Sequence, residues 1–155
     1  MASHTTKSIR DLLKHVESDE LVLPEIQRDF VWTAKSVMKL FDSLFRGMPI
    51  GHILVWKARQ AVQAKAFSKK SNPTNPGQIE SFYGYLLDGQ QRLTAIARIK
   101  DRDPDYALRF NLKPVDAEPK DTRFAWENRR NADDPWFVSV ADVLNKSLKP
   151  VQMLG

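Results

Sequence analysis

The feature that most constrains the fold is a pair of short apolar runs, over 50–56 and 82–87, each bounded by turn-forming residues. A continuous apolar run of this length is typical of a β-strand that is covered on both faces. Both runs are therefore predicted to be buried strands, with 50–56 at the centre of its sheet. The second run passes directly into Asp88-Gly89, after which Leu93 and Ile96 resume helical spacing, so the chain changes there from a strand to a helix.

The rest of the chain mixes helices and short strands without regular alternation. Helices are predicted over 9–16, from an N-cap at Thr33 to a stop at Gly47 and Pro49, and from Val140 toward Leu148. A strand that Pro24 interrupts is predicted within 21–32, and shorter extended segments over 106–112, 122–126 and 136–140. This mixture indicates an α+β fold in which helices flank a mixed β-sheet.

The length of 155 residues is the usual size of one domain, so a single domain is predicted over 1–155. Apolar content falls and Lys, Asn and Pro accumulate over 58–81, which predicts an exposed loop. The last five residues carry no stop signal, as in a piece cut from a longer protein. No export signal and no apolar run near the ~20 residues of a membrane span are present, so a cytoplasmic protein with no membrane partner is expected.

The composition excludes several kinds of site. The absence of cysteine removes disulfides, thiolate metal sites and cysteine nucleophiles. The three histidines, His4, His15 and His52, do not have the spacing of a zinc site or of a histidine-based nuclease, and no P-loop motif is present. The net charge of +5 permits an anionic partner such as a nucleotide or a nucleic acid.

The first candidate site is the turn Asp88-Gly89-Gln90-Gln91-Arg92, where a strand meets a helix. Gly89 cannot shield its amide, and the amides that open a helix carry partial positive charge, so this turn can donate to a phosphate. Arg92 can clamp an anion, and Asp88 can hold a divalent ion or orient a water molecule. The same spacing is also typical of a structural turn, with Asp88 as the helix cap and two solvated glutamines.

The second candidate is Gln27-Arg28, which lies in the interrupted strand. Arg28 and Arg92 would converge on one anion if their strands are neighbours in the sheet. In the alternative interpretation, Arg28 forms a surface ion pair with Asp29 or Glu25 and has no ligand.

The segments Leu23-Pro24-Glu25-Ile26-Gln27-Arg28-Asp29-Phe30-Val31-Trp32 and Tyr85-Leu86-Leu87-Asp88-Gly89-Gln90-Gln91-Arg92-Leu93-Thr94-Ala95 together resemble the N-terminal domain of GmrSD-type restriction endonucleases. The resemblance implies a ParB/sulfiredoxin-like fold that binds a nucleoside triphosphate (NTP) with Mg²⁺. It also implies a defence system against phage DNA, in which a separate nuclease domain or subunit cuts the DNA. Ile26 stands where relatives often carry an aromatic residue. The implied roles are catalytic for Asp88, Gln91 and Arg92, nucleotide-binding for Gln27, Arg28, Gly89 and Gln90, and metal-binding for Asp88.

Three hypotheses therefore stand side by side. In the first, the domain binds and hydrolyses an NTP and so regulates DNA restriction. In the second, it is a DNA-binding module without turnover, whose phosphate contacts include Lys65, Lys69 and Lys70. In the third, it is a scaffold that positions a nuclease domain and binds neither ligand.

Overall fold

The computed structural model describes residues 6–58, 62–65, 67, 83–113 and 123–145. The length predicts one domain, and the chain groups into two compact units. Unit 1 comprises Met1–Val31 and Gly51–Ala97, and unit 2 comprises Trp32–Ile50 and Arg98–Gly155. Each unit is described by itself.

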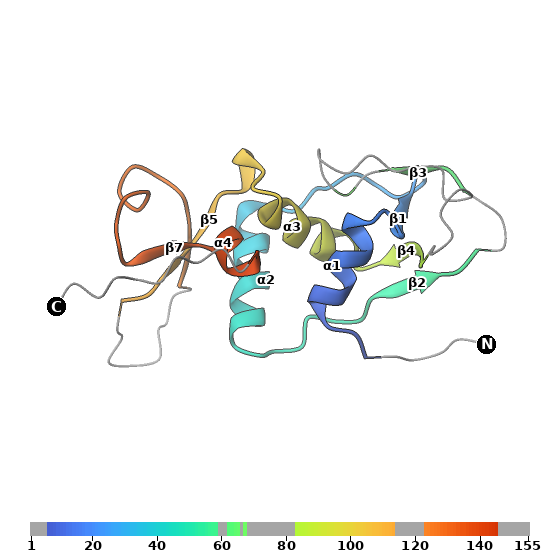
Figure 1. The fold of residues 1–155 in the computed structure, drawn as a ribbon, viewed down its shortest axis with the longest axis horizontal. Helices are drawn as coiled ribbons and strands as arrows, with labels where there is room; N and C mark the ends of the chain where they lie inside the picture. Colours follow the sequence, from blue (N-terminus) through green and yellow to red (C-terminus); the bar gives the residue numbers. More distant parts are fainter. Residues whose placement is uncertain (1–5, 59–61, 66, 68–82, 114–122, 146–155) are drawn as a thin grey trace. The chain divides into compact units, whose positions relative to one another are not determined.

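The sheet of unit 1 has four strands in the order β2-β4-β1-β3 (Figure 1). These strands are β1 (Leu21–Pro24), β2 (Leu54–Trp56), β3 (Ala64–Lys65) and β4 (Gly84–Asp88). β1 and β4 pair in parallel, whereas β2 pairs antiparallel with β4 and β3 antiparallel with β1. The predicted mixed β-sheet of an α+β fold is therefore confirmed.

The apolar run 50–56 is an exception, because it forms an edge strand and not a central one. Only Leu54–Trp56 is a strand, and Leu54 and Trp56 are 55% and 44% exposed. Gly51 has a φ of +91°, which interrupts the extended conformation earlier in the run. The two central positions belong to β4, where Tyr85 and Leu86 have no exposed surface, and to β1, all four residues of which are buried.

The segment 58–81 was predicted to be an exposed loop, and its described part contains the short strand β3. Ala64 pairs with Pro24 and Lys65 with Leu23, so this strand extends the sheet beyond β1. Phe67 is buried at 3% exposure. Val62, Gln63, Ala64 and Lys65 alternate between apolar and polar as in a strand, but the Lys, Asn and Pro residues of the whole segment dominate its composition and concealed this pattern. The rest of the segment lies outside the described residues.

The two helices of unit 1 follow their sequence signals. α1 (Ile9–Glu17) begins at the N-cap Ser8, whose Oγ accepts the N–H of Asp11, and the Ser8 hydroxyl donates to the Asp11 carboxylate and lowers its pKa. α1 packs on β1 through its buried leucines and Val16. α3 (Gln90–Lys100) begins directly after Gly89, as the strand-to-helix turn predicts, and its part up to Ala97 belongs to unit 1.

Unit 2 has an antiparallel sheet in the order β6-β5-β7. Figure 1 labels β5 and β7 of this sheet and the helices α2 and α4 of this unit. Its strands are β5 (Leu108–Asn111), β6 (Phe124–Trp126) and β7 (Phe137–Ser139), and its helices are α2 (Ala34–Phe45), the 3-10 turn η2 (Pro104–Tyr106) and α4 (Val140–Leu144). The strands confirm the three predicted extended segments, and the Thr33 side chain caps α2 as predicted. α2 packs on β6, where Phe41 contacts the ring of Phe124. Within the described residues, no helix is long and apolar enough to span a membrane.

Candidate functional site

The two segments that carry the sequence motifs lie side by side in unit 1. β1 leads into 25–31 and β4 leads into 88–92, and these strands are parallel neighbours. This arrangement confirms the condition under which Arg28 and Arg92 were expected to converge. Gln27 Nε2 donates to the carbonyl of Leu87 at 3.1 Å, which ties the first segment to the end of β4.

The paired glutamines of the second motif supply three more hydrogen bonds to the first segment. Gln90 Nε2 donates to the carbonyl of Arg28 at 2.5 Å, and Gln91 Nε2 donates to the carbonyl of Asp29 at 3.0 Å. Gln91 Oε1 also accepts the N–H of Val31 at 2.8 Å. Both glutamines are only 6% exposed. We call this set of hydrogen bonds, made by Gln27, Gln90 and Gln91, the glutamine clamp.

The clamp bears on the roles that were predicted for the two glutamines. Gln90 was expected to bind nucleotide and Gln91 to act in catalysis, and the solvated glutamines of the structural alternative were also considered. The structure buries both side chains and directs their amides to main-chain groups of another segment. Because they fix the backbone from Arg28 to Val31, they determine where that arginine is presented.

Lys65 also holds the segment 25–31, from the strand β3 on the other side of β1. Its ammonium group on β3 donates to the carbonyl of Gln27 and pairs with the Asp29 carboxylate at 2.9 Å. The Lys65 side chain is 27% exposed. The DNA-binding role predicted for Lys65 therefore competes with an internal contact. Lys69 and Lys70, which were given the same role, lie outside the described residues.

Gly89 is required at the turn by both conformation and space. Its φ is +91°, and a Cβ atom at this position would collide with the side chain of Ile53. Its N–H donates to Asp88 Oδ1 at 2.7 Å. The amide that was predicted to face a phosphate therefore already binds an anion, the carboxylate of Asp88. This side chain is 69% exposed, so an external ligand can reach its carboxylate.

Arg92 is the less exposed of the two motif arginines, since only 15% of its side chain is accessible. Its Nη2 lies 3.4 Å from Asp88 Oδ2, one helical turn away. The guanidinium packs directly over Gly51, where a Cβ atom would collide with it. Gly51 is thus a site residue that was not identified from the sequence, although the stretch Gly-Met-Pro-Ile-Gly that it ends is rich in turn-forming residues.

Arg28 differs from Arg92 because it is exposed. The sequence left open a surface ion pair with Asp29 or Glu25. Asp29 instead pairs with Lys65, and no carboxylate of the described residues pairs with Arg28. The interpretation of Arg28 as half of a surface ion pair is therefore wrong for this part of the chain. Its guanidinium is available to an external anion.

Only Asp88 was named as a metal ligand. In the described part of the chain, no group of three or more His, Asp or Glu side chains is arranged to hold a metal ion. Mg²⁺ in nucleotide sites is commonly held by one or two carboxylates together with the phosphates of the substrate. The exposed carboxylate of Asp88 fits that mode of binding. It does not fit a site in which protein side chains supply all the ligands.

Comparison with known proteins places this geometry in context. The family model "GmrSD restriction endonuclease, N-terminal domain" matches residues 9–149. An uncharacterized protein of Methanocaldococcus jannaschii is 32% identical over 115 residues, which cover 72% of this chain and 20% of that protein. The chain thus spans about a fifth of the length of that relative. No solved structure gave a significant match.

Proposed function

Because the chain belongs to the family of N-terminal domains of GmrSD restriction endonucleases, we propose that its two motif segments form a nucleotide site that regulates DNA restriction. The glutamine clamp is the observation that carries this proposal. It joins segments about 60 residues apart and holds the exposed Arg28 beside the turn that bears Asp88 and Arg92. Two guanidinium groups and one carboxylate suit a phosphate ester with its cation.

In this proposal Arg28 and Arg92 bind the phosphates, and the remaining motif residues position them. Arg28 is exposed and approaches the ligand as a bidentate donor. Arg92 is held against Gly51, so little conformational entropy is lost when it binds. Gln90 and Gln91 fix the backbone of the 28–31 segment. They act as positioning residues in place of the direct contacts that the motif first indicated.

The proposed cation is Mg²⁺ or another divalent ion, and Asp88 is its protein ligand. When bound, the cation neutralises charge on the phosphate oxygens. The Asp88 carboxylate then turns away from the Gly89 N–H, and this amide becomes a donor for the phosphate that replaces it. One anion therefore exchanges for another at the start of α3.

We further propose that the nucleotide is hydrolysed. Water attacks the terminal phosphorus, the bond to the bridging oxygen breaks, and the products are a nucleoside diphosphate and inorganic phosphate. Arg28 and Arg92 stabilise the negative charge that develops on the transferred group, as arginines do in other phosphoryl transfers. The cutting of DNA is assigned to a nuclease domain or subunit beyond these residues, since the chain spans a fifth of its longer relative.

The resemblance also leads us to propose a ParB/sulfiredoxin-like fold for the domain. The mixed sheet β2-β4-β1-β3, with a motif turn that leads from a central strand into a helix, supports this assignment. An experimental structure superposed on that superfamily checks it, and a different strand order would refute it.

Thermal unfolding with ATP, GTP, CTP or UTP, each with and without Mg²⁺, tests the nucleotide site. At a hundredfold excess over Kd, a ligand stabilises by about 2.7 kcal/mol, which raises the melting temperature by several degrees. We expect this rise for at least one nucleotide with Mg²⁺, and its loss in Arg92→Ala. Arg46→Ala is the matched control, because Arg46 pairs with Asp42 at the same i,i+4 spacing. No rise with any nucleotide, or an equal loss in both variants, contradicts the proposal.

A further inference from the structure

A short loop after β6 presents two adjacent arginines on a hydrogen-bonded frame. The N–H of Asn128 donates to Asn131 Oδ1 at 2.8 Å, and Asn131 Nδ2 donates to the carbonyl of Trp126 at 3.0 Å. The N–H of Arg130 donates to Asn128 Oδ1 at 2.8 Å. Asn131 is only 4% exposed, so its amide is part of the interior. These bonds fix the backbone of 127–132, which we call the arginine loop.

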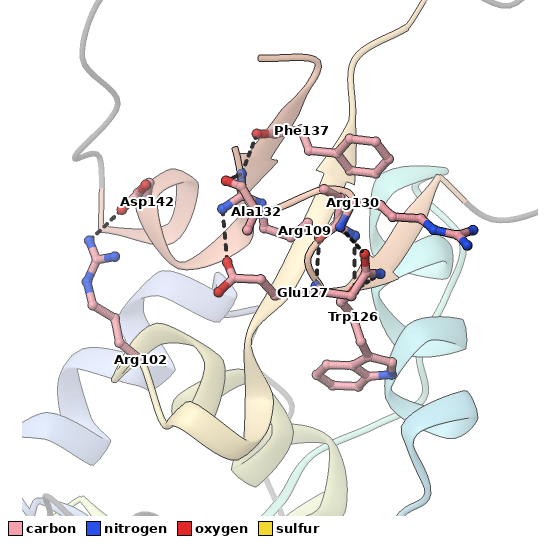
Figure 2. Close-up of polar contacts among 10 residues, drawn as sticks. Arg102, Arg109, Trp126, Glu127, Arg130, Ala132, Phe137 and Asp142 are labelled. Carbon is pink, nitrogen blue, oxygen red and sulfur yellow. Dashed lines mark hydrogen bonds and ion pairs between the residues drawn. The ribbon is translucent and has the colours of Figure 1, made fainter. Parts of the chain in front are cut away.

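Arg109 on β5 fastens the same loop from within unit 2 (Figure 2). Its Nη1 pairs with Glu127 at 2.9 Å, and its Nη2 donates to the carbonyls of Ala132 at 2.8 Å and Phe137 at 2.9 Å. The Arg109 side chain is 14% exposed. Both ends of the loop are therefore held by one buried guanidinium, which also neutralises the carboxylate of Glu127.

The side chains that the loop directs outward are cationic. Arg129 and Arg130 are both exposed, and Figure 2 shows Arg130 extending away from the hydrogen-bonded frame. Among the residues that the structure describes, neither guanidinium has an ion-pair partner. Asp134, an acidic residue just beyond the loop, pairs with Lys113 at 3.7 Å. Two adjacent guanidinium groups thus remain available on a rigid support.

We propose that the arginine loop is a contact surface for the phosphates of duplex DNA. The planar fork of arginine binds phosphate oxygens in pairs, and the fixed backbone lowers the entropy lost on binding. The net charge of +5 attracts a polyanion over longer distances, and a family named for DNA restriction supplies the partner class. The proposal does not depend on the nucleotide site, because the loop belongs to unit 2 and the motifs to unit 1.

Fluorescence anisotropy with a short labelled duplex tests this surface. In the double variant Arg129→Ala/Arg130→Ala we expect about tenfold weaker binding at low salt, and a slope of log K against log salt that is smaller by about 2. The control is Lys35→Ala/Lys39→Ala on the exposed face of α2, which removes the same charge from unit 2. We expect the control to weaken binding less than about twofold, because it leaves the phosphate contacts intact.

A third variant separates the contribution of the hydrogen bonds that fix the loop from that of the two arginine charges. Asn131→Ala keeps both arginines but removes the hydrogen bonds that fix the loop, so we expect a several-fold loss of duplex affinity with an unchanged salt slope. Equal weakening in the two double variants would mean that only total charge matters, and unchanged binding in the arginine variant would mean that the loop is not the contact. A selective loss of binding to polyglutamate, with duplex binding intact, would assign the loop to an acidic protein. Each of these three results overturns the proposal.

Discussion

In two regions of the molecule, buried amide side chains hold a segment that carries exposed arginines. The regions differ in the sequence separation of the hydrogen bonds that do this. Arg28 lies on a segment that buried glutamines fasten, and Arg129 and Arg130 lie on a loop that a buried asparagine fastens. The glutamines are 60 to 62 positions away from the groups they bind, whereas Asn131 binds groups three and five positions away. The conformation of the first region therefore depends on the tertiary fold. The conformation of the second depends mainly on hydrogen bonds within the loop, together with the contacts of Arg109.

This difference has a consequence for function. A tertiary clamp makes the two motif segments a single unit, so a change at either segment alters the presentation of Arg28 and Arg92 together. A locally closed loop responds only to changes in its own residues and in Arg109. Substitutions in the two regions distinguish these two behaviours.

Gly89→Ala is expected to have the largest effect, because it disturbs the motif turn directly. The residue needs a φ of +91°, and the new Cβ would collide with Ile53. Strain and overpacking together should cost about 3 kcal/mol. Gly47→Ala is the control, since Gly47 has a φ of +66° with nothing within 4 Å of an added Cβ, and it should cost about 1 kcal/mol. Urea unfolding measures both, and equal losses would mean that the contact with Ile53 is unimportant.

Gln91→Ala should reduce the free energy of unfolding by about 2 kcal/mol, because it removes the two hydrogen bonds by which a buried side chain holds the N–H of Val31 and the carbonyl of Asp29. It should also abolish the nucleotide-dependent rise in melting temperature, although Arg28 and Arg92 are both retained. Gln91→Glu tests the mechanism, because a carboxylate can still accept from Val31 but cannot donate to Asp29. A Gln91→Ala chain that keeps its full nucleotide response would show that the clamp does not position the site.

Asn131→Ala should cost about 1.5 kcal/mol, since the buried amide makes hydrogen bonds within its own loop. In contrast to Gln91→Ala, it should leave the nucleotide-dependent rise in melting temperature unchanged. Thermal unfolding with and without nucleotide measures both quantities on one sample. Loss of the nucleotide response in this variant would remove the distinction between a local and a tertiary fastening.

Lys65→Met is expected to give the smallest effect, below about 1 kcal/mol, because its partner Asp29 is 94% exposed and the ion pair is screened by water. The loss should shrink further at high salt, which urea unfolding at two salt concentrations measures. If Lys65 contacts DNA, as the sequence predicted, Lys65→Met should instead weaken duplex binding more than the control Lys35→Ala does.

Local signals predicted much of the fold. Thr33 was identified as a helix cap from its residue type, and its side chain caps α2 by accepting the N–H of Ser36. The change from strand to helix at Asp88-Gly89 was also correct. These features depend on neighbouring residues, so a sequence read locally contains them.

Features that depend on distant contacts were not predicted. The apolar composition of 50–56 did not show that β2 would lie at an edge, because strand order is set by tertiary pairing, in which β4 lies between β2 and β1. The amides of Gln90 and Gln91 were assigned to a ligand, because their main-chain partners lie about 60 residues earlier. Gly51 was placed in the apolar run 50–56, and its contact with the Arg92 guanidinium was not predicted because it arises only from tertiary packing.

The most direct test of the paired-motif site is a titration of the ¹⁵N-labelled chain with the Mg²⁺ complex of the nucleotide that stabilises it, followed by backbone-amide NMR. We predict that the amide chemical shifts of 28–31 and of 89–92 change together with one binding constant. The amide chemical shifts of the arginine loop should not change. Shifts confined to one of the two motif segments, or shifts in the arginine loop alone, would contradict the claim that the motifs form a single nucleotide site.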